Sequence, residues 1–164
     1  MSLVVADTGP LRYLIAVGAI GHLPRLYPQV LVPPAVVAEL RHTRAPAIVR
    51  QWAQTLPPWI EIQRPQLSHN PQRLDPGEAE ALGLALQIRA SVVLLDEMEA
   101  RREAVRLGLS ITGTVGILER MSERGLLNLE EAFTRLTATN YRIDRNYLDD
   151  ALKRARLHGR SREP

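Results

Sequence analysis

Short hydrophobic runs alternate with longer amphipathic stretches along most of the chain. The runs are rich in valine, isoleucine and leucine, which is typical of strands buried in a sheet. The longer stretches repeat hydrophobic residues roughly every three or four positions, which is typical of helices. The pattern predicts strands at 3–6, 30–32, 59–62, 91–95 and 109–112. It predicts helices at 11–15, 34–40, 45–56, 76–89, 97–107, 114–124, 128–138 and 144–157.

Proline and acidic residues mark the boundaries between these elements. Pro33 and Pro34 end the second strand, and Pro34 can be the first residue of the helix that follows. Asp75 can cap the clearest helix, with Glu78 in its first turn. The polar, proline-bearing stretch 63–73 predicts a surface loop. Strands that alternate with helices favour an α/β fold, a three-layer α/β/α arrangement with a central parallel sheet.

The composition is that of a globular domain. The chain has 164 residues, of which 45% are hydrophobic and 24% charged, so one hydrophobic core is expected. The longest apolar runs are too short to cross a bilayer, and no basic segment precedes a long apolar stretch at the N-terminus. We therefore expect a cytoplasmic protein. The absence of cysteine excludes disulfides and thiolate metal sites, which leaves carboxylates and histidines as ligands.

The net charge of +3 is unevenly distributed. Basic residues crowd the end of the chain: Lys153, Arg154, Arg156, Arg160 and Arg162. We expect one domain over 1–150 and a basic C-terminal tail over 151–164. The tail is consistent with contact to phosphate, and equally with a solvated, frayed terminus.

Four acidic residues are expected to meet at one edge of the sheet. Asp7 and Asp96 each follow a predicted strand directly, and the carboxyl ends of parallel strands share an edge. The helix that begins near Glu78 is roughly 20 Å long, and the strand back to Asp96 returns roughly 16 Å, so Glu78 lies at that edge too. Glu39 lies early in the helix after the second strand, within side-chain reach of the same edge.

Converging carboxylates favour a metal site. Close carboxylates repel one another and raise one another's pKa values unless cations compensate them, and hard oxygen ligands select Mg²⁺ or Mn²⁺. Such ions can activate water and stabilise the leaving oxygen in phosphodiester hydrolysis. Thr8 is placed to position the water or to support Asp7, and backbone amides at the 7–9 turn can help to hold a phosphate oxygen.

The motifs around these acids resemble those of PIN domains. In chain order they are Asp7-Thr8-Gly9-Pro10-Leu11, Pro33 to Leu40, Leu74 to Leu82, and Leu94-Leu95-Asp96. Gly108 with Ile111 to Leu118 is similar to the PIN-like branch called DUF3368. The resemblance covers roughly Leu3 to Leu127. The ordered set is far more specific than any one motif.

The resemblance implies a Mg²⁺- or Mn²⁺-dependent ribonuclease. Many PIN domains are VapC-type toxins held inactive by a cognate antitoxin, so it also implies a toxin of a toxin–antitoxin pair with a small antitoxin partner. It implies that Asp7, Glu39, Glu78 and Asp96 carry the metal site. The departure from the family pattern is Glu78, where PIN domains more often have aspartate.

Each acid also has an ordinary structural interpretation. Asp7 and Asp96 are common residue types for helix N-caps, and Glu39 is compatible with an exposed helix position. Asp75 and Glu78 have the spacing of a capping box, in which the glutamate side chain bonds back to the N-cap backbone. Glu97 adjoins the expected site and could bind metal through water.

Other functions find less support in the sequence. A phosphotransfer domain lacks a second aspartate two positions after Asp7, because residue 9 is glycine, and has no lysine after a later strand. Neither a G-x-G-x-x-G nor a G-x-x-x-x-G-K-[ST] loop follows a strand, which argues against nucleotide-binding modules. The alternative that stays open is a catalytically degenerate PIN-like module that binds RNA or a protein.

We also expect a homodimer. The expectation rests on the family resemblance and on the apolar helix pattern of Val115, Leu118 and Met121, with Leu126 and Leu127 beyond it. Few aromatic residues are available for base stacking, so recognition of RNA would depend on its shape and backbone.

Overall fold

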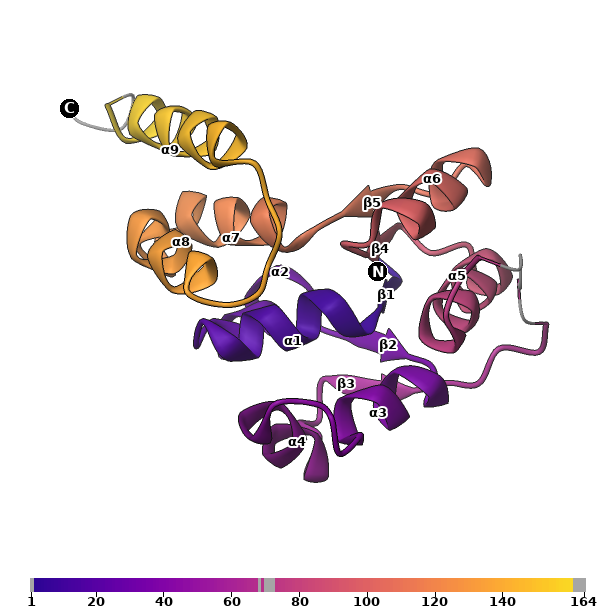
Figure 1. The fold of residues 1–164 in the computed structure, drawn as a ribbon. Helices are drawn as coiled ribbons and strands as arrows, with labels where there is room; N and C mark the ends of the chain where they lie inside the picture. Colours follow the sequence, from indigo (N-terminus) through magenta and orange to yellow (C-terminus); the bar gives the residue numbers. More distant parts are fainter. Residues whose placement is uncertain (1, 68, 70–72, 161–164) are drawn as a thin grey trace.

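The structure is a computed structural model that describes residues 2–67, 69 and 73–160 (Figure 1). The strands within these ranges are β1 (Val4–Ala6), β2 (Val30–Val32), β3 (Ile60–Ile62), β4 (Val92–Leu94) and β5 (Ile111–Thr112). The helices of the first half are α1 (Thr8–Ala16), η1 (Ile20–His22), α2 (Leu23–Leu26), α3 (Pro34–Arg41) and α4 (Ala47–Gln54). Those of the second half are α5 (Pro76–Ile88), α6 (Met98–Arg106), α7 (Thr114–Glu123), α8 (Leu129–Thr137) and α9 (Arg145–Arg160).

The strands form one parallel sheet in the order β3-β2-β1-β4-β5. Val5 pairs with Leu31 of β2 on one side and with Val93 of β4 on the other. The chain moves outward in one direction from β1 to β3 and in the other direction from β4 to β5. The order therefore reverses between β1 and β4, and in open parallel sheets ligands bind in the crevice beyond the carboxyl ends of the strands at such a reversal.

Helices cover both faces of the sheet, so the three-layer α/β/α fold expected from the sequence is confirmed (Figure 1). Alternate strand residues point to opposite faces. Val4, Ala6 and Leu94 face the larger core, which includes buried residues of α1, α3, α4, α7 and α8. Val5 and Val93 face a smaller core that α5 and α6 complete.

Most elements lie where the hydrophobic pattern places them, but η1 and α2 were not predicted. These two short helices fill the connection between α1 and β2. Leu23 is their fully buried residue, and a single buried residue gives no periodicity from which a helix can be recognised. The loop expected at 63–73 agrees with the residues described there; positions 68 and 70–72 lie outside the described residues.

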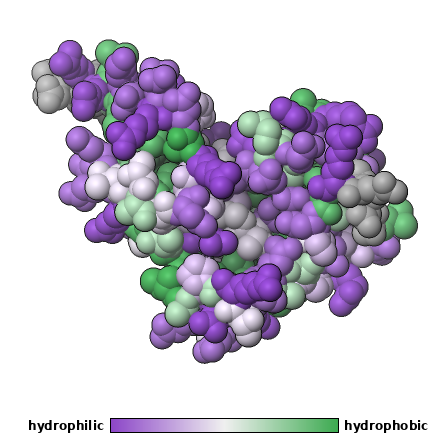
Figure 2. Space-filling model, viewed as in Figure 1, coloured by the Kyte–Doolittle hydropathy of each residue, from purple (hydrophilic) through white to green (hydrophobic). Residues whose placement is uncertain are grey.

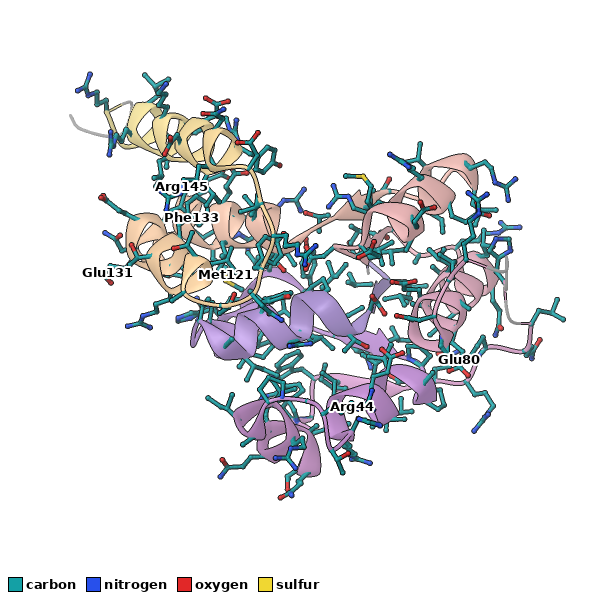
Figure 3. All side chains as sticks on the ribbon, in the orientation of Figure 1. Arg44, Glu80, Met121, Glu131, Phe133 and Arg145 are labelled. Carbon is teal, nitrogen blue, oxygen red and sulfur yellow. The ribbon has the colours of Figure 1, made fainter. Side chains whose placement is uncertain are left out.

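The apolar pattern on α7 serves the core of this chain. Val115, Leu118 and Met121 are buried against α1, α2 and α8, and Figure 3 shows Met121 and Phe133 pointing into the packed layer. Leu126 and Leu127 pack against the same core. This pattern therefore supplies no dimer surface, and the homodimer stays a prediction that rests on the family resemblance.

The C-terminal helix α9 runs through the expected domain boundary at residue 150 without interruption. Leu148 and Ala151 on either side of this point are buried, and α9 packs on α7 and α8. Basic residues 153–160 therefore form the exposed side of an attached helix, while 161–164 lie outside the described residues. The face seen in Figure 2 is mainly hydrophilic. Among the described helices, none is long and apolar enough to cross a membrane.

Replacing Leu94 by alanine should destabilise the protein strongly. Leu94 is fully buried in β4 beside β1, so truncation leaves a cavity in the centre of the larger core. We expect the free energy of unfolding to fall by about 2–5 kcal/mol in urea titrations. Leu67→Ala is the control, because Leu67 is 81% exposed. If Leu94→Ala lowered the free energy of unfolding as little as Leu67→Ala does, the placement of β4 at the centre of the sheet would be contradicted.

Candidate metal centre

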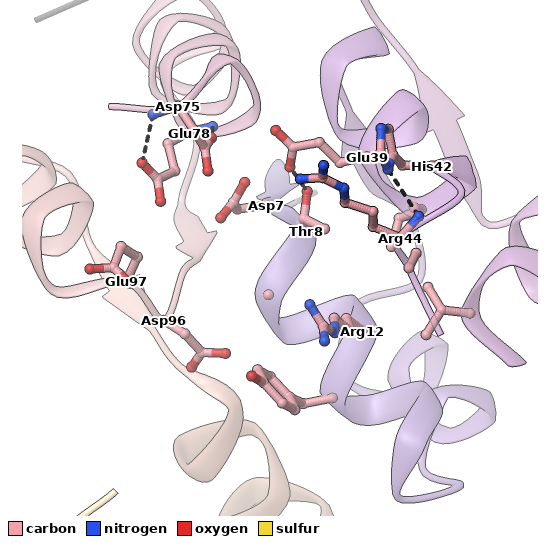
Figure 4. Close-up of a pocket in the computed structure, with 15 residues that line it drawn as sticks. Asp7, Thr8, Arg12, Glu39, His42, Arg44, Asp75, Glu78, Asp96 and Glu97 are labelled. Atoms are coloured by element: carbon pink, nitrogen blue, oxygen red, sulfur yellow. Dashed lines mark hydrogen bonds between the residues drawn. The ribbon is translucent and has the colours of Figure 1, made fainter. Parts of the chain in front are cut away.

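The carboxyl ends of β1 and β4 open into one pocket of about 430 Å³ (Figure 4). Asp7 follows β1 directly, and Asp96 follows Leu95, which extends the pairing of β4 through its N–H to the carbonyl of Thr112 (2.9 Å). The acidic residues that line the pocket are Asp7, Glu39, Asp75, Glu78, Asp96 and Glu97. The expected convergence of four acids on one edge is therefore present in the fold. Their role as metal ligands stays a prediction.

Three of the carboxylates form a tighter group. One oxygen each of Asp7, Glu39 and Asp75 lies within 4.8 Å of the other two. The three come from the end of β1, from α3 and from the start of α5, so residues far apart in sequence supply them. Separations of this size let one cation contact oxygens from all three residues.

Glu39 is held from two sides. Thr8 donates its hydroxyl to Oε2 of Glu39, and the backbone N–H of Gly77 donates to Oε1 (3.0 Å). Gly77 allows this approach because a Cβ at that position would lie 2.6 Å from both Glu39 oxygens. Thr8 thus supports Glu39, whereas the sequence had associated it with Asp7 or with water.

Asp75 and Glu78 form the capping box that their spacing predicts. Oδ1 of Asp75 accepts from the N–H of Glu78 (2.8 Å), and Oε2 of Glu78 accepts from the N–H of Asp75 (3.0 Å). The box fixes the start of α5. It also orients the Asp75 carboxylate, whose position in the group of three carboxylates was not predicted.

Asp96 is fixed by residues from α7 and from the segment after α8. Its Oδ1 accepts from the N–H of Thr114 (2.8 Å) and from the hydroxyl of Tyr141 (3.1 Å), and its Oδ2 accepts from the Thr114 hydroxyl (2.6 Å). Oδ2 also lies 3.4 Å from the position that a Cβ on Gly9 would take. Asp96 therefore anchors the start of α7 while facing the turn that carries Asp7.

Burial dominates the electrostatics of this cluster. It is the largest cause of the raised pKa of Asp7, to which the negative charges of Asp75, Glu78 and Glu39 add. Burial likewise raises the pKa of Glu39, that of Glu78 to about 7, and that of Asp96 in spite of its hydrogen bonds from Thr114 and Tyr141. Hydrogen bonds compensate the negatively charged forms of Glu39, Glu78 and Asp96 only in part.

The cluster fits a divalent cation. Asp7 is 5% exposed, and its Oδ1 is buried without a hydrogen-bond partner among the described residues. Its side chain also makes no capping hydrogen bond to α1, so the ordinary helix-cap interpretation of Asp7 does not hold. A buried, unpaired carboxylate oxygen is costly, and a cation next to it would offset that cost. Oxygen-only donors of this kind suit Mg²⁺ or Mn²⁺.

One further acid has a structural role. Oε2 of Glu80 accepts from the N–H of Ala35 (2.9 Å), so Glu80 caps α3 across the interface with α5. Figure 3 shows Glu80 on the side of α5 next to α3. Glu97 lines the pocket, which agrees with a position next to the site.

Comparisons with known proteins point to one family. A family model described as a PIN domain, DUF3368, matches residues 3–157. A solved structure, a PilT N-terminus domain protein SSO1118 from the archaeon Sulfolobus solfataricus P2, is similar with a TM-score of 0.50. It is 10% identical over 87% of this chain and 99% of its own, a likeness that concerns the fold. No curated protein matches the chain.

Stability of the metal-free protein should fall as the pH rises. Because Glu78 has a folded-state pKa of about 7 and Asp7, Glu39 and Asp96 are also raised, the folded protein keeps protons that the unfolded chain has released. Unfolding free energy then decreases from about pH 4.5 to above the pKa of Glu78. Thermal melting in EDTA at about pH 5.5 and pH 8 measures this. Glu78→Gln should flatten the profile, and a melting temperature that rises with pH would contradict the argument.

Asp75→Asn should separate metal binding from helix capping. Asparagine caps helices about as well as aspartate, so the melting temperature in EDTA should change little. The lost charge should weaken Mn²⁺ binding in calorimetric titrations by at least about tenfold. Asp75→Ala additionally removes the cap and should cost about 1 kcal/mol of stability. Unchanged Mn²⁺ affinity in Asp75→Asn would remove Asp75 from the ligand set.

Proposed function

This chain belongs to the PIN domain family, and from that premise we propose that it is a Mg²⁺- or Mn²⁺-dependent endoribonuclease. PIN domains are generally metal-dependent nucleases, and the present chain carries the fold over nearly its whole length.

The observation that carries the proposal is the group of Asp7, Glu39 and Asp75. Their oxygens lie within 4.8 Å of one another, and Oδ1 of Asp7 has no partner among the described residues. A degenerate domain that only binds RNA or protein has no need for a buried, uncompensated carboxylate at this point, because such a group lowers stability. A metal-dependent enzyme does need one.

A divalent ion bound here would activate a water molecule and compensate the charge that develops on the phosphate oxygens. The chain's own residues would do the rest. Asp7, Glu39 and Asp75 would hold the ion, while Thr8 and the Gly77 N–H keep the Glu39 carboxylate in place. Asp96 and Glu78 extend the negative lining of the pocket. His42 is the histidine that lines this pocket, and the proposed reaction requires no histidine base.

The biological role that we propose is that of a toxin in a toxin–antitoxin pair. The support is the likeness of the sequence motifs to VapC-type PIN domains. On this proposal a small antitoxin protein blocks the pocket, and the enzyme acts as a homodimer in the cytoplasm. A reading frame for a small protein next to this gene, whose product co-purifies with the chain and suppresses its activity, would support the role.

Purified protein should cut RNA only when a divalent ion is present. We expect cleavage of single-stranded or structured RNA with Mg²⁺ or Mn²⁺ and none with EDTA, measured on denaturing gels. Asp7→Asn should lower the cleavage rate by more than roughly 10- to 100-fold, which is the loss typical of a residue that only supports a metal ligand. The matched control is Asp149→Asn, which removes one exposed aspartate from α9.

The outcomes separate the two candidate functions. Wild-type protein that binds RNA but leaves it intact under all metal conditions would favour the binding module. Cleavage that persists in EDTA, or equally in Asp7→Asn, would show a contaminating or metal-independent nuclease.

A further inference from the structure

Two arginines line the same pocket as the acidic residues. Arg12 belongs to α1 and Arg44 to the turn after α3. From their positions we infer that they form a phosphate-binding side of the pocket, which holds the RNA backbone next to the carboxylates. The inference rests on the proposed ribonuclease function and names the residues that position its substrate.

Both arginines are attached to the elements that carry the metal-binding group. Arg12 lies four residues after Thr8 in α1, so the two side chains are neighbours on one helix face. Arg44 follows α3, which carries Glu39. The N–H of Arg44 donates to Nδ1 of His42 (3.0 Å), which fixes the turn from which the Arg44 side chain extends.

The close-up of the pocket shows where the two side chains lie. In Figure 4, Arg12 and Arg44 are on the side formed by α1 and α3, together with Thr8 and Glu39. Glu78, Asp96 and Glu97 lie on the opposite side. A nucleic-acid strand whose phosphates contact the arginines would therefore pass directly beside the carboxylates.

Neither guanidinium group has a hydrogen bond or an ion pair with a carboxylate within the described part of the chain. Arg12 has its guanidinium carbon 5.8 Å from the ring centre of Tyr13, and the polar contact of Arg44 is through its backbone. Other arginines behave differently: Arg106 and Arg154 each pair with a glutamate at the surface. In a pocket with six acidic residues, guanidinium groups without a carboxylate partner keep their donors for another anion.

The chemistry of that anion follows from the donors. A guanidinium group offers a planar fork of N–H groups that matches a phosphate with two parallel hydrogen bonds. Six carboxylates around the pocket would repel RNA, so the arginines alone hold it weakly. Bound metal reduces this repulsion. RNA affinity should therefore depend on the arginines and on the divalent ion together.

The alternative is that the arginines only reduce repulsion among the carboxylates. In that case their replacement would change metal affinity and the pH dependence of melting but not the interaction with RNA. Two readouts separate these roles: the salt dependence of RNA binding and the division of the kinetic effect between KM and kcat.

The test compares Arg12→Gln and Arg44→Gln with Arg25→Gln. Arg25 is an exposed arginine in α2, before the start of β2 and thus at the other end of the sheet. Binding of a fluorescent single-stranded RNA is measured by anisotropy over a range of monovalent salt concentrations, in EDTA and with a divalent ion that does not support cleavage, and cleavage is measured with Mn²⁺. Each pocket variant should raise KM by about tenfold or more with a smaller change in kcat. Each should also reduce the slope of log affinity against log salt by about 0.7.

The control should match the wild type in both measurements. Pocket variants that match Arg25→Gln in KM and in salt slope would overturn the inference while leaving the ribonuclease function intact. Wild-type protein that binds RNA through these arginines without cutting it would overturn the function and keep the phosphate site. Protein that neither binds nor cuts RNA would overturn both.

Discussion

The cost of burying several carboxylates in one pocket is the constraint on which the site of this protein depends. The sheet reverses its strand order between β1 and β4, and Asp7 and Asp96 emerge side by side at that reversal. Burial makes their charged forms costly, and for Asp7 the neighbouring carboxylates of Asp75, Glu78 and Glu39 add to that cost. A cation in the pocket would offset this cost. The carboxylates cost the fold stability, which is the usual relation between a functional site and the scaffold that holds it.

The carboxylates that face the pocket also hold the scaffold together. Asp75 caps α5 with one oxygen and belongs to the group with Asp7 and Glu39, so one residue has two roles. Helix capping and a place in the group of three carboxylates are therefore compatible in Asp75. Glu39 and Asp96 accept hydrogen bonds from Gly77 and Thr114 in the same way, at the starts of α5 and α7. Helix N-termini stabilise negative charge, so these helices partly compensate the carboxylates before any metal binds.

The regular part of the fold could be predicted because hydrophobic periodicity is a local property. Continuous apolar runs such as Val92 to Leu95 identify strands buried on both faces, and the order of strands and helices selects the fold class. The strand order was not predictable, because pairing between β1 and β4 is decided by contacts across nearly ninety residues. For the site, the sequence predicted the edge of the sheet and the acids that gather there. It did not predict the closer group of Asp7, Glu39 and Asp75. Distances of a few ångströms depend on the directions of side chains, which a sequence pattern does not give. Asp75 therefore joins the group unexpectedly, and the Thr8 hydroxyl donates to Glu39 instead of Asp7.

The segment after α8 links the C-terminal part of the chain to the pocket. Tyr141 donates to Asp96, and its ring meets Tyr13 of α1 edge-on with 4.7 Å between ring centres. The Tyr13 hydroxyl in turn donates to Asn140 (3.1 Å). These contacts join the connection between α8 and α9 to both sides of the β1/β4 reversal. Because Asp96 lies at the junction, the position of its carboxylate depends on the packing of α7, α8 and α9 as well as on the sheet. The C-terminal helices are therefore part of the structure that shapes the pocket.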